Sequence, residues 1–282
     1  MQRFFATGLP WASMFWLFFR THCFDPGDVY LLGGDEVVVT KAGKHTHGLD
    51  RFFCSLYGKP VPGLAFFALS LISTRKRHSF PIRVEQVVRD PAEHTAVPRR
   101  RRQKPPASAT PRRCGRPKGT KTKDKTAVTL TPELQRITGM VQGLLPMIEG
   151  VAPLTYRVLD GHFGHNTAVQ MTRPCDLPLI SKLRADSALY LPYAGPSAGR
   201  GPQRQYGDKL DYGALPERSL QQTTVEDGIE TRIDQLEVLH KEFAQPLNVV
   251  IILTRNLTTH KCAHVVLCSS DRALYGEKLM DY

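Results

Sequence analysis

The sequence predicts an α/β fold with a mixed sheet, interrupted by a basic linker and followed by a β-rich insertion. Three observations predict it. Strand-like segments come first along the chain, helical and strand-like segments then alternate, and almost all of the net positive charge is confined to one Pro-containing segment between these two parts. Antiparallel strands followed by alternating helices and strands are typical of a layered α/β domain.

The first part of the chain predicts three strands. Residues 28–34, "DVYLLGG", form a continuous apolar run that predicts a buried strand ending at Asp35, and "EVVVT" continues the extended pattern. Residues 64–73 are apolar and predict a second strand, and residues 79–88 alternate as a third.

The second part alternates helices with strands. Thr131 as N-cap and Pro132 at the first helical position predict a helix that runs to about Glu149. The elements that follow are a strand over 153–159 running into Asp160, a helix over 166–173 and a strand over 177–184. Three strands, a helix, a strand, a helix and a strand is the order of an RNase-H-like core.

The remaining residues predict a β-rich insertion and the start of a last core helix. "PLNVVIILTRNL" and "CAHVVLCSS" are typical of a hairpin, and Asp271 is the expected cap of the final helix. The predicted organisation is an apolar helical segment at 1–26, the core in two parts at 27–90 and 128–185, a linker at 91–127, an insertion at 186–269 and an incomplete last helix at 270–282.

The basic linker carries almost the whole net charge. Residues 99–125 contain twelve Lys or Arg and one Asp, whereas the full chain has a formal charge of +12. A basic segment rich in Pro, Gly, Ser and Thr is too polar to form a core, so we expect it to be disordered or extended. The expected phosphate contacts are Arg99, Arg100, Arg101, Arg102, Arg112, Arg113, Arg116, Lys118, Lys121 and Lys123.

Within this linker, Gly115-Arg116-Pro117 resembles an AT-hook, which inserts an arginine into the narrow minor groove of A·T-rich DNA. The segment departs from that motif at Cys114, where a full hook carries a second arginine. Two interpretations therefore stay open, a hook-like contact with DNA and a solvated basic linker.

The N-terminal segment and the cysteines are informative about the cellular compartment of the protein. Residues 4–19 are uncharged, but the run is shorter than the roughly 20 residues that a membrane span needs and it contains Pro10. A buried helical segment is the preferred interpretation over a signal peptide or a span. The six cysteines form no regular framework, which is typical of reduced intracellular thiols.

Asp160 has two interpretations from its position alone. An aspartate after a buried strand either caps the following helix or serves as a metal ligand. The choice between them comes from a resemblance carried by several blocks, among them "LLGGDEVVVTKAGKHTHGLDRFFCSLYGKPVPGLAFFALSLIS", "GRPKGTKTKD", "YRVLDGHFGHNTAVQM" and "LISKLRADSALYLPY".

These blocks resemble the DDE transposases of bacterial insertion sequences that carry a β-strand insertion in an RNase-H-like catalytic domain. The resemblance implies that two aspartates and a glutamate bind Mg²⁺ or Mn²⁺ for DNA cleavage and strand transfer, with Asp35 as the first acid and Asp160 as the second. It also implies double-stranded DNA as partner (transposon ends and target), a homodimer in a complete enzyme, no membrane, and a cytoplasmic location at the bacterial nucleoid.

The third acid departs from the family pattern. In relatives it lies on the last helix within a Tyr-x₂-Arg-x₃-Glu-x₆-Lys pattern, and this sequence reaches "KLMDY" where the pattern should begin. Glu277 does not fit because no arginine lies four residues before it. We therefore expect a truncated, inactive copy; the alternative function is that of a non-catalytic basic DNA-binding remnant.

Three further sets of residues have competing interpretations. Asp50 is an alternative first acid, although no strand leads into it. His162 and His165 are placed to shape the loop or to touch DNA, rather than to bind a transition metal. His260, Cys262, His264 and Cys268 share a strand face, but their spacing is too wide for a compact zinc site, which favours packing in the core.

Overall fold

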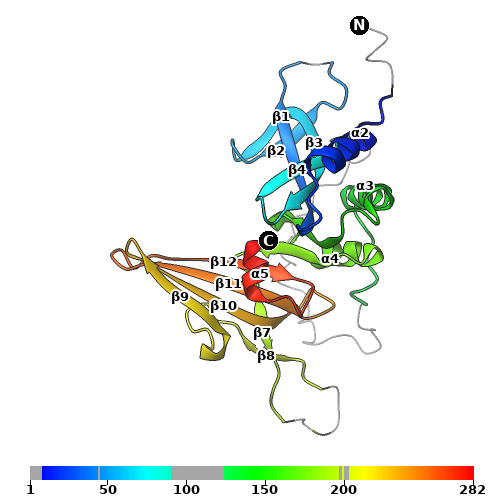
Figure 1. The fold of residues 1–282 in the computed structure, drawn as a ribbon. Helices are drawn as coiled ribbons and strands as arrows, with labels where there is room; N and C mark the ends of the chain where they lie inside the picture. Colours follow the sequence, from blue (N-terminus) through cyan, green and yellow to red (C-terminus); the bar gives the residue numbers. More distant parts are fainter. Residues whose placement is uncertain (1–7, 44, 90–123, 197–198, 200–202) are drawn as a thin grey trace, which may run out of the picture. The chain divides into compact units, whose positions relative to one another are not determined.

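The computed structural model describes residues 8–43, 45–89, 124–196, 199 and 203–282 (Figure 1). The chain divides into two compact units. The first is formed by the described residues within 1–36, 67–84 and 125–282, and the second by those within 37–66 and 85–124. Strands β1 (Tyr30–Thr40) and β3 (Lys59–Ser73) each contribute residues to both units.

The described chain starts with helix α2 (Trp11–Phe18), which continues as a π-helical turn at Phe19–Cys23. Phe19 is buried, and its ring packs against that of Tyr30, with 5.4 Å between the ring centroids. The expected helix is thus present, but the expectation of a buried segment is wrong for most of α2, where Leu17 is 65% exposed. Among the described helices none is both long and apolar enough to cross a membrane.

The strands predicted in the first part are present with different bounds. β1 extends to Thr40 and does not end at Asp35, because the β-branched run after Glu36 favours extended backbone. β3 begins at Lys59, and β4 (His78–Val87) pairs with it as the third strand. Strand β2 (Asp50–Cys54) has no counterpart among the predicted strands.

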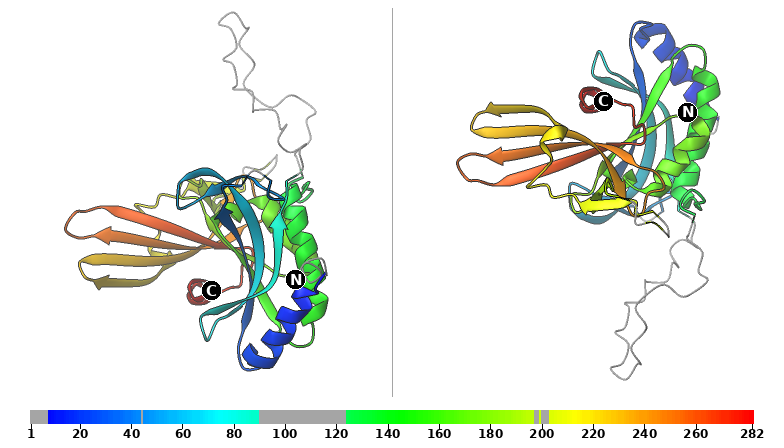
Figure 2. Two further views of the ribbon diagram at one scale, coloured as in Figure 1. Left: turned by 90° about the horizontal axis from the view of Figure 1, so that it is seen from above. Right: turned by 90° about the horizontal axis from the view of Figure 1, so that it is seen from below.

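The alternating part of the prediction is confirmed. Helix α3 (Pro132–Ile148) has Thr131 as its N-cap, and the hydroxyl of Thr131 accepts a hydrogen bond from the backbone N–H of Leu134 at 3.3 Å. It is followed by β5 (Leu154–Leu159), α4 (Asn166–Thr172) and β6 (Leu179–Leu183). The strand order β1-β5-β6 is parallel, and α3 and α4 lie on one face of these strands (Figure 2).

The strands of the expected insertion extend the same sheet. β12 (Cys262–Ser269) pairs antiparallel with β6, and β11 (Leu247–Asn256) pairs antiparallel with β12, so the hairpin predicted for these two strands is confirmed. Beyond β11 the order continues through β10 (Ile229–His240), with β9 (Leu220–Glu226) on it, to β7 (Leu189–Pro192) and β8 (Tyr206–Lys209).

Helix α5 (Gly276–Asp281) covers the face of the sheet opposite to α3 and α4 (Figure 2). Its Leu279 belongs to a buried cluster against which Tyr156 and Val158 of β5 pack. The expected capping by Asp271 is wrong, since its carboxylate accepts from Ala273 N at 2.8 Å in a turn that precedes the helix. The other oxygen of Asp271 accepts from the hydroxyl of Tyr156 at 2.7 Å, which ties this turn to β5.

In the second unit, β2 pairs antiparallel with the first part of β3, from Asp50↔Gly63 to Cys54↔Lys59. Arg89 lies over the ring of Phe52 at 4.5 Å and forms an ion pair of 3.5 Å with Asp50. These contacts fasten the end of the described segment after β4 to strand β2.

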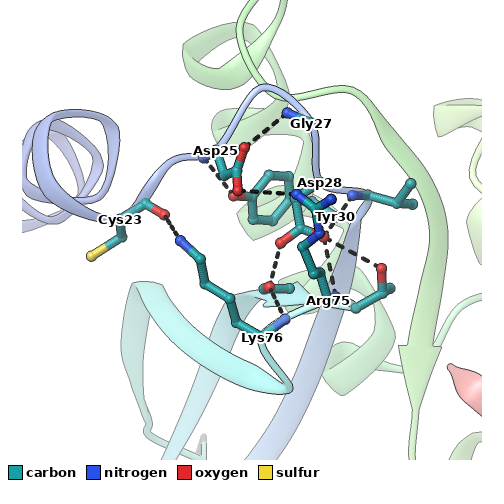
Figure 3. Close-up of polar contacts among 10 residues, drawn as sticks. Cys23, Asp25, Gly27, Asp28, Tyr30, Arg75 and Lys76 are labelled. Carbon is teal, nitrogen blue, oxygen red and sulfur yellow. Dashed lines mark hydrogen bonds and ion pairs between the residues drawn. The ribbon is translucent and has the colours of Figure 1, made fainter.

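A buried aspartate secures the start of β1. Asp28 is 7% exposed, and its carboxylate accepts a hydrogen bond from the hydroxyl of Ser73 at the end of β3 (Figure 3). It also accepts from the backbone N–H groups of Val29 at 2.8 Å and Arg75 at 3.2 Å. Burial by itself raises the pKa of Asp28, but these hydrogen bonds outweigh it, so the pKa is lowered overall. The ionised carboxylate therefore stabilises the connection of β1 to the β3–β4 turn.

Replacement of Asp28 by Asn should lower the free energy of unfolding at pH 7 by about 1–3 kcal/mol, because a buried, hydrogen-bonded charge is lost. A pKa lowered by folding stabilises the folded state above the unfolded-state pKa of about 3.9, and this contribution disappears as the pH falls through the folded-state pKa. The difference between wild type and Asp28→Asn should thus be constant from pH 7 to about 5 and shrink below about pH 4.

Denaturant unfolding at several pH values measures this difference. Asp25→Asn is the matched control, because Asp25 forms an ion pair of 3.5 Å with the exposed side chain of Arg75 and should contribute little. Equal losses for the two variants at pH 7 would contradict the role of Asp28.

Candidate functional site

The parallel pairing of β1 with β5 brings Asp35 and Asp160 together. The register matches Gly33 with Val158 and Gly34 with Leu159, so the two aspartates are the next residues on neighbouring strands. Neighbouring strands lie about 4.8 Å apart, and residues at the same register position point to the same face. Both side chains are exposed. Two carboxylates that are 125 positions apart in the sequence therefore lie on the same face of the sheet, on adjacent strands.

The two glycines before Asp35 permit this close approach. A Cβ atom on Gly34 would lie 2.7 Å from Leu159 Cδ2 and 2.9 Å from Phe67 Cζ. A Cβ atom on Gly33 would lie 2.5 Å from Ile72 Cδ1. A side chain at either position would require these neighbouring side-chain ends to move, so the "GGD" sequence suits the tight packing beside the site.

Asp160 is held in place by its backbone and by one carboxylate oxygen. Its Oδ1 accepts from the backbone N–H of His162 at 3.1 Å and caps the short 3₁₀ turn Gly161–Phe163. The hydroxyl of Ser181 donates to its carbonyl oxygen at 2.7 Å. The capping interpretation of Asp160 is thus correct for a 3₁₀ turn, and because it uses only Oδ1 it leaves room for a second role of the carboxylate.

Asp35 lies in the middle of β1 and not at its end. The buried part of the strand ends at Gly33, Gly34 is partly exposed, and Asp35 is exposed beyond it. Its Oδ1 accepts from the backbone N–H of Glu36 at 2.8 Å. The expected position at a strand end is wrong, although the change from buried to exposed backbone occurs where the sequence predicts it.

The donor set of the pair suits a hard divalent cation. Carboxylate oxygens are the preferred protein ligands of Mg²⁺, which keeps several waters and commonly takes one or two carboxylates. Within the described residues no group of three or more His, Cys, Asp or Glu side chains is arranged to hold a metal ion. Asp35 and Asp160 can therefore supply part of a coordination shell, with water or substrate oxygens supplying the rest.

Lys182 is a third charged residue next to Asp35 and Asp160, and the sequence did not predict it as a site residue. β5 and β6 pair with Val158 opposite Ile180, so the next residues on the same face are Asp160 and Lys182. Asp35, Asp160 and Lys182 therefore occupy matching positions on three neighbouring strands. The lysine is exposed. Only the register reveals it, because a single lysine in an apolar strand has no motif around it.

The two histidines have structural partners, as predicted for loop-shaping residues. His165 caps α4, with its Nδ1 accepting from the backbone N–H of Ala168 at 3.3 Å. Its pKa is lowered by burial first and by His162 second, so it stays neutral at pH 7. His162 Nε2 lies 3.5 Å from the carboxylate of Glu133 in the first turn of α3.

The other candidate sites are not assembled. Asp50 begins β2, accepts from Arg51 N at 2.6 Å and pairs with Arg89, which gives it a structural role. Cys268 is buried, whereas Cys262 is exposed, so the favoured interpretation of core packing is correct only for Cys268. His264 stacks on Tyr212, with 4.2 Å between the ring centroids.

The basic residues proposed to bind DNA, from Arg99 to Lys123, lie outside the described residues. Lys125, just after them, is firmly held. Its Nζ donates to the carbonyl of Phe243 at 3.0 Å and to the hydroxyl of Tyr206 at 3.3 Å. Asn166 donates to the carbonyl of Lys125 at 2.7 Å and accepts from Ala244 N at 3.0 Å. These contacts tie the chain at Lys125 to α4 and to the residues that follow β10.

Helix α5 shares a face of the sheet with the paired carboxylates. Tyr156, Val158 and Asp160 alternate along β5 and so point to one side, and the first two pack against the α5 cluster. Tyr282 at the end of α5 lies 5.6 Å from the ring of Tyr156, measured between centroids. Glu277, in the first turn of α5, is exposed.

Comparison with known protein families gives a match over most of the chain. A family model described as "DDE superfamily endonuclease" matches residues 1–240, which include Asp35, Asp160 and Lys182. A comparison with curated proteins gives no match.

Replacement of Gly34 by Ala should impair both stability and metal binding, because the new methyl group would collide with Leu159 and Phe67 and separate β1 from β5. Such overpacking typically costs about 1–3 kcal/mol. Thermal unfolding and Mn²⁺ titration calorimetry measure the two effects. Gly139→Ala in α3 is the control, since nothing lies within 4 Å of the added Cβ atom and alanine favours the helix. Unchanged Mn²⁺ affinity in a folded Gly34→Ala protein would contradict the requirement for close approach.

Proposed function

The chain belongs to the DDE superfamily of endonucleases, and on that premise we propose that it is a transposase-type enzyme of a bacterial insertion sequence, with Asp35 and Asp160 as its metal-binding acids. The substrate is double-stranded DNA at the nucleoid. The reaction is cleavage of a phosphodiester bond and transfer of the freed strand.

One observation carries the proposal. The β1–β5 register gives Asp35 and Asp160 matching positions on parallel neighbours, and both side chains are exposed. Structural aspartates of this chain behave differently: Asp28 is buried in hydrogen bonds, and Asp50 is paired with Arg89. Two like charges side by side repel each other unless a cation lies between them, so their adjacency favours a bound Mg²⁺ or Mn²⁺.

The residues of this chain have separate tasks. A divalent ion in such a site activates the attacking water or 3′-hydroxyl and stabilises the leaving oxygen. Asp35 and Asp160 would hold the ion, and the bonds from His162 N and Ser181 Oγ keep Asp160 in a fixed conformation. Lys182, on the neighbouring strand, is placed to bind a phosphate oxygen of the DNA and so to orient the scissile bond.

The linker supplies affinity for DNA without supplying chemistry. Arg and Lys side chains between residues 99 and 123 neutralise phosphates and release counterions, and Arg116 adds a preference for A·T-rich minor grooves. Lys125 anchors the C-terminal end of this segment to the first unit through Phe243 and Tyr206. The linker thereby raises the concentration of DNA near the unit that carries Asp35 and Asp160.

The rate of DNA cleavage by the 282-residue chain depends on whether a third carboxylate reaches the site. Among the described residues only two carboxylates meet at the site, and two-metal catalysis needs a further ligand. Glu277 is a candidate for the third acid, because it is exposed in the first turn of the helix that covers this face. It does not match the spacing of the family pattern, so we propose that the chain binds one ion and cleaves slowly.

The 282-residue chain should bind Mn²⁺ through Asp35 and Asp160 but nick supercoiled DNA only weakly. Loss of one metal ion removes several kcal/mol of stabilisation, and each 1.36 kcal/mol reduces the rate about tenfold. Asp160→Asn and Asp35→Asn should each abolish Mn²⁺ binding measured by calorimetry. Asp50→Asn is the control and should bind as the wild type does.

Two results would change this proposal. Wild-type Mn²⁺ affinity in both Asp35→Asn and Asp160→Asn would remove the site altogether. Fast, Mg²⁺-dependent nicking that is lost in Asp35→Asn and in Glu277→Gln, but kept in Asp281→Asn, would contradict slow cleavage and assign Glu277 as the third ligand.

Replacement of residues 99–123 by a Gly/Ser linker of equal length should weaken duplex binding by at least about 100-fold at about 0.15 M salt, because most phosphate contacts are removed. The slope of log affinity against log salt should fall in parallel, as measured by fluorescence anisotropy. Arg116→Ala should reduce the ratio of A·T-rich to G·C-rich binding, with Arg112→Ala as the control. Unchanged affinity of the Gly/Ser variant would refute the linker assignment.

A further inference from the structure

A cavity of about 540 Å³ lies in the first unit, beside strands β7, β8 and β10. Its described lining consists of Lys125, the end of β7 with Tyr193, residues 203–206, the end of β10 and residues 243–246. The carboxylate pair and Lys182 are not among these residues, so the proposed cleavage does not use this space. A cavity of this size accommodates one small organic molecule.

The described lining carries a net positive charge. Lys125 and Arg204 are its two cations, and Glu237 is its one acid among the described residues. The carboxylate of Glu237 lies 2.6 Å from Nε of Arg272, so this negative charge already has a partner. The cavity therefore favours an anionic ligand.

Both cations have N–H groups left for such a ligand. An ammonium group has three donors, and Lys125 Nζ uses one toward the carbonyl of Phe243 at 3.0 Å and one toward the hydroxyl of Tyr206 at 3.3 Å. Among the described residues, Arg204 donates only from Nε, to the carbonyl of Tyr206 at 2.8 Å. The remaining donors on Nζ, Nη1 and Nη2 suit the oxygens of a phosphate group.

Aromatic rings make up a further part of the lining. They belong to Tyr193, Tyr206, His240 and Phe243. The guanidinium of Arg204 lies over the ring of Tyr193, 4.8 Å from its centroid. Aromatic faces and arginine planes both stack on nucleobases, and this contact tolerates any base. The wall of the cavity therefore suits a flat aromatic ring as well as an anion.

Amide groups and one imidazole supply hydrogen bonds for the edge of such a ring. Gln203, Gln205 and Gln245 line the cavity and are exposed. A glutamine amide both donates and accepts, and it can pair in this way with N6 and N7 of adenine. Nδ1 of His240 accepts from Glu242 N at 3.2 Å, and burial lowers the pKa of this histidine, so the neutral ring keeps a donor on Nε2.

We propose that this cavity is a binding site for a single nucleotide, with the base against the aromatic and amide side chains and the phosphate at Lys125 and Arg204. Binding there is independent of the proposed cleavage reaction, because the lining contains neither Asp35 nor Asp160. A free nucleotide and an unpaired nucleotide of a DNA strand share this chemistry.

Isothermal titration calorimetry of the 282-residue chain with dAMP tests the site, at about 0.15 M salt with EDTA present. We expect saturable one-to-one binding. Arg204→Ala and Tyr193→Leu should each weaken it by at least about fivefold, because a phosphate contact or a stacking surface is lost. Arg184→Ala and Tyr57→Leu are the matched controls and should bind dAMP as the wild type does, since both residues are exposed and lie outside the lining.

Two results would overturn the proposal. One is the absence of saturable dAMP binding, and the other is wild-type affinity in both Arg204→Ala and Tyr193→Leu. A second measurement covers variants that do not fold. Saturating dAMP should raise the midpoint of thermal unfolding of the wild type, and deoxyadenosine, which lacks the phosphate, should raise it less. An unchanged midpoint with dAMP would also contradict the site.

A competition experiment separates the two sources of the nucleotide. Single-stranded hexadeoxyadenylate is added to the wild-type complex with dAMP. Displacement of dAMP would identify an unpaired DNA strand as a ligand of the cavity, whereas retention of dAMP would identify a free nucleotide.

Discussion

The parallel pairing of β1 with β5 is the interaction on which the rest of the candidate site depends. It is a backbone contact, and Gly33 and Gly34 leave room beside it for the side chains of Ile72, Leu159 and Phe67. From this register follow the adjacency of Asp35 and Asp160 and, through β6, the position of Lys182. The hydrogen bonds of Asp28 hold the other end of β1 and so limit sliding of the strand.

The two faces of β5 carry opposite charges in different surroundings, an exposed carboxylate on one and a buried guanidinium on the other. Tyr156, Val158 and Asp160 point to the face that α5 covers. The last of them, Asp160, is an exposed carboxylate just after the C-terminal end of β5. Arg157 and Leu159 point to the opposite face, where the arginine is fully buried. Alternation along a strand thus places a cation and an anion three residues apart in very different dielectric surroundings, and only the anion is available to a solvated ion.

Local features of the fold were predictable from the sequence, whereas long-range ones were not. The N-cap of α3 at Thr131, the strands around 153–159 and 177–184 and the β11–β12 hairpin follow from residue patterns within a few positions. The pairing of β12 with β6, the role of Ser73 toward Asp28 and the alignment of Lys182 join distant segments, and no local pattern encodes them. For Asp35 and Asp160, the family resemblance predicts a role as metal ligands, and the register shows that they lie on neighbouring strands.

The separation of β1 from β5 along the chain also sets the order of events during synthesis. β5 begins 124 residues after β1 does, so the ribosome must add all of these residues before the two strands can pair. At about 5–20 residues per second, β1 waits roughly 6–25 s with its apolar "YLLGG" half lacking this neighbour. Parallel pairing across so long a separation is also slow, because the chain loses loop entropy before the contacts form. The β3–β4 segment is complete much earlier, and its pairing with β1 is available to shelter that strand until the carboxylate pair can form.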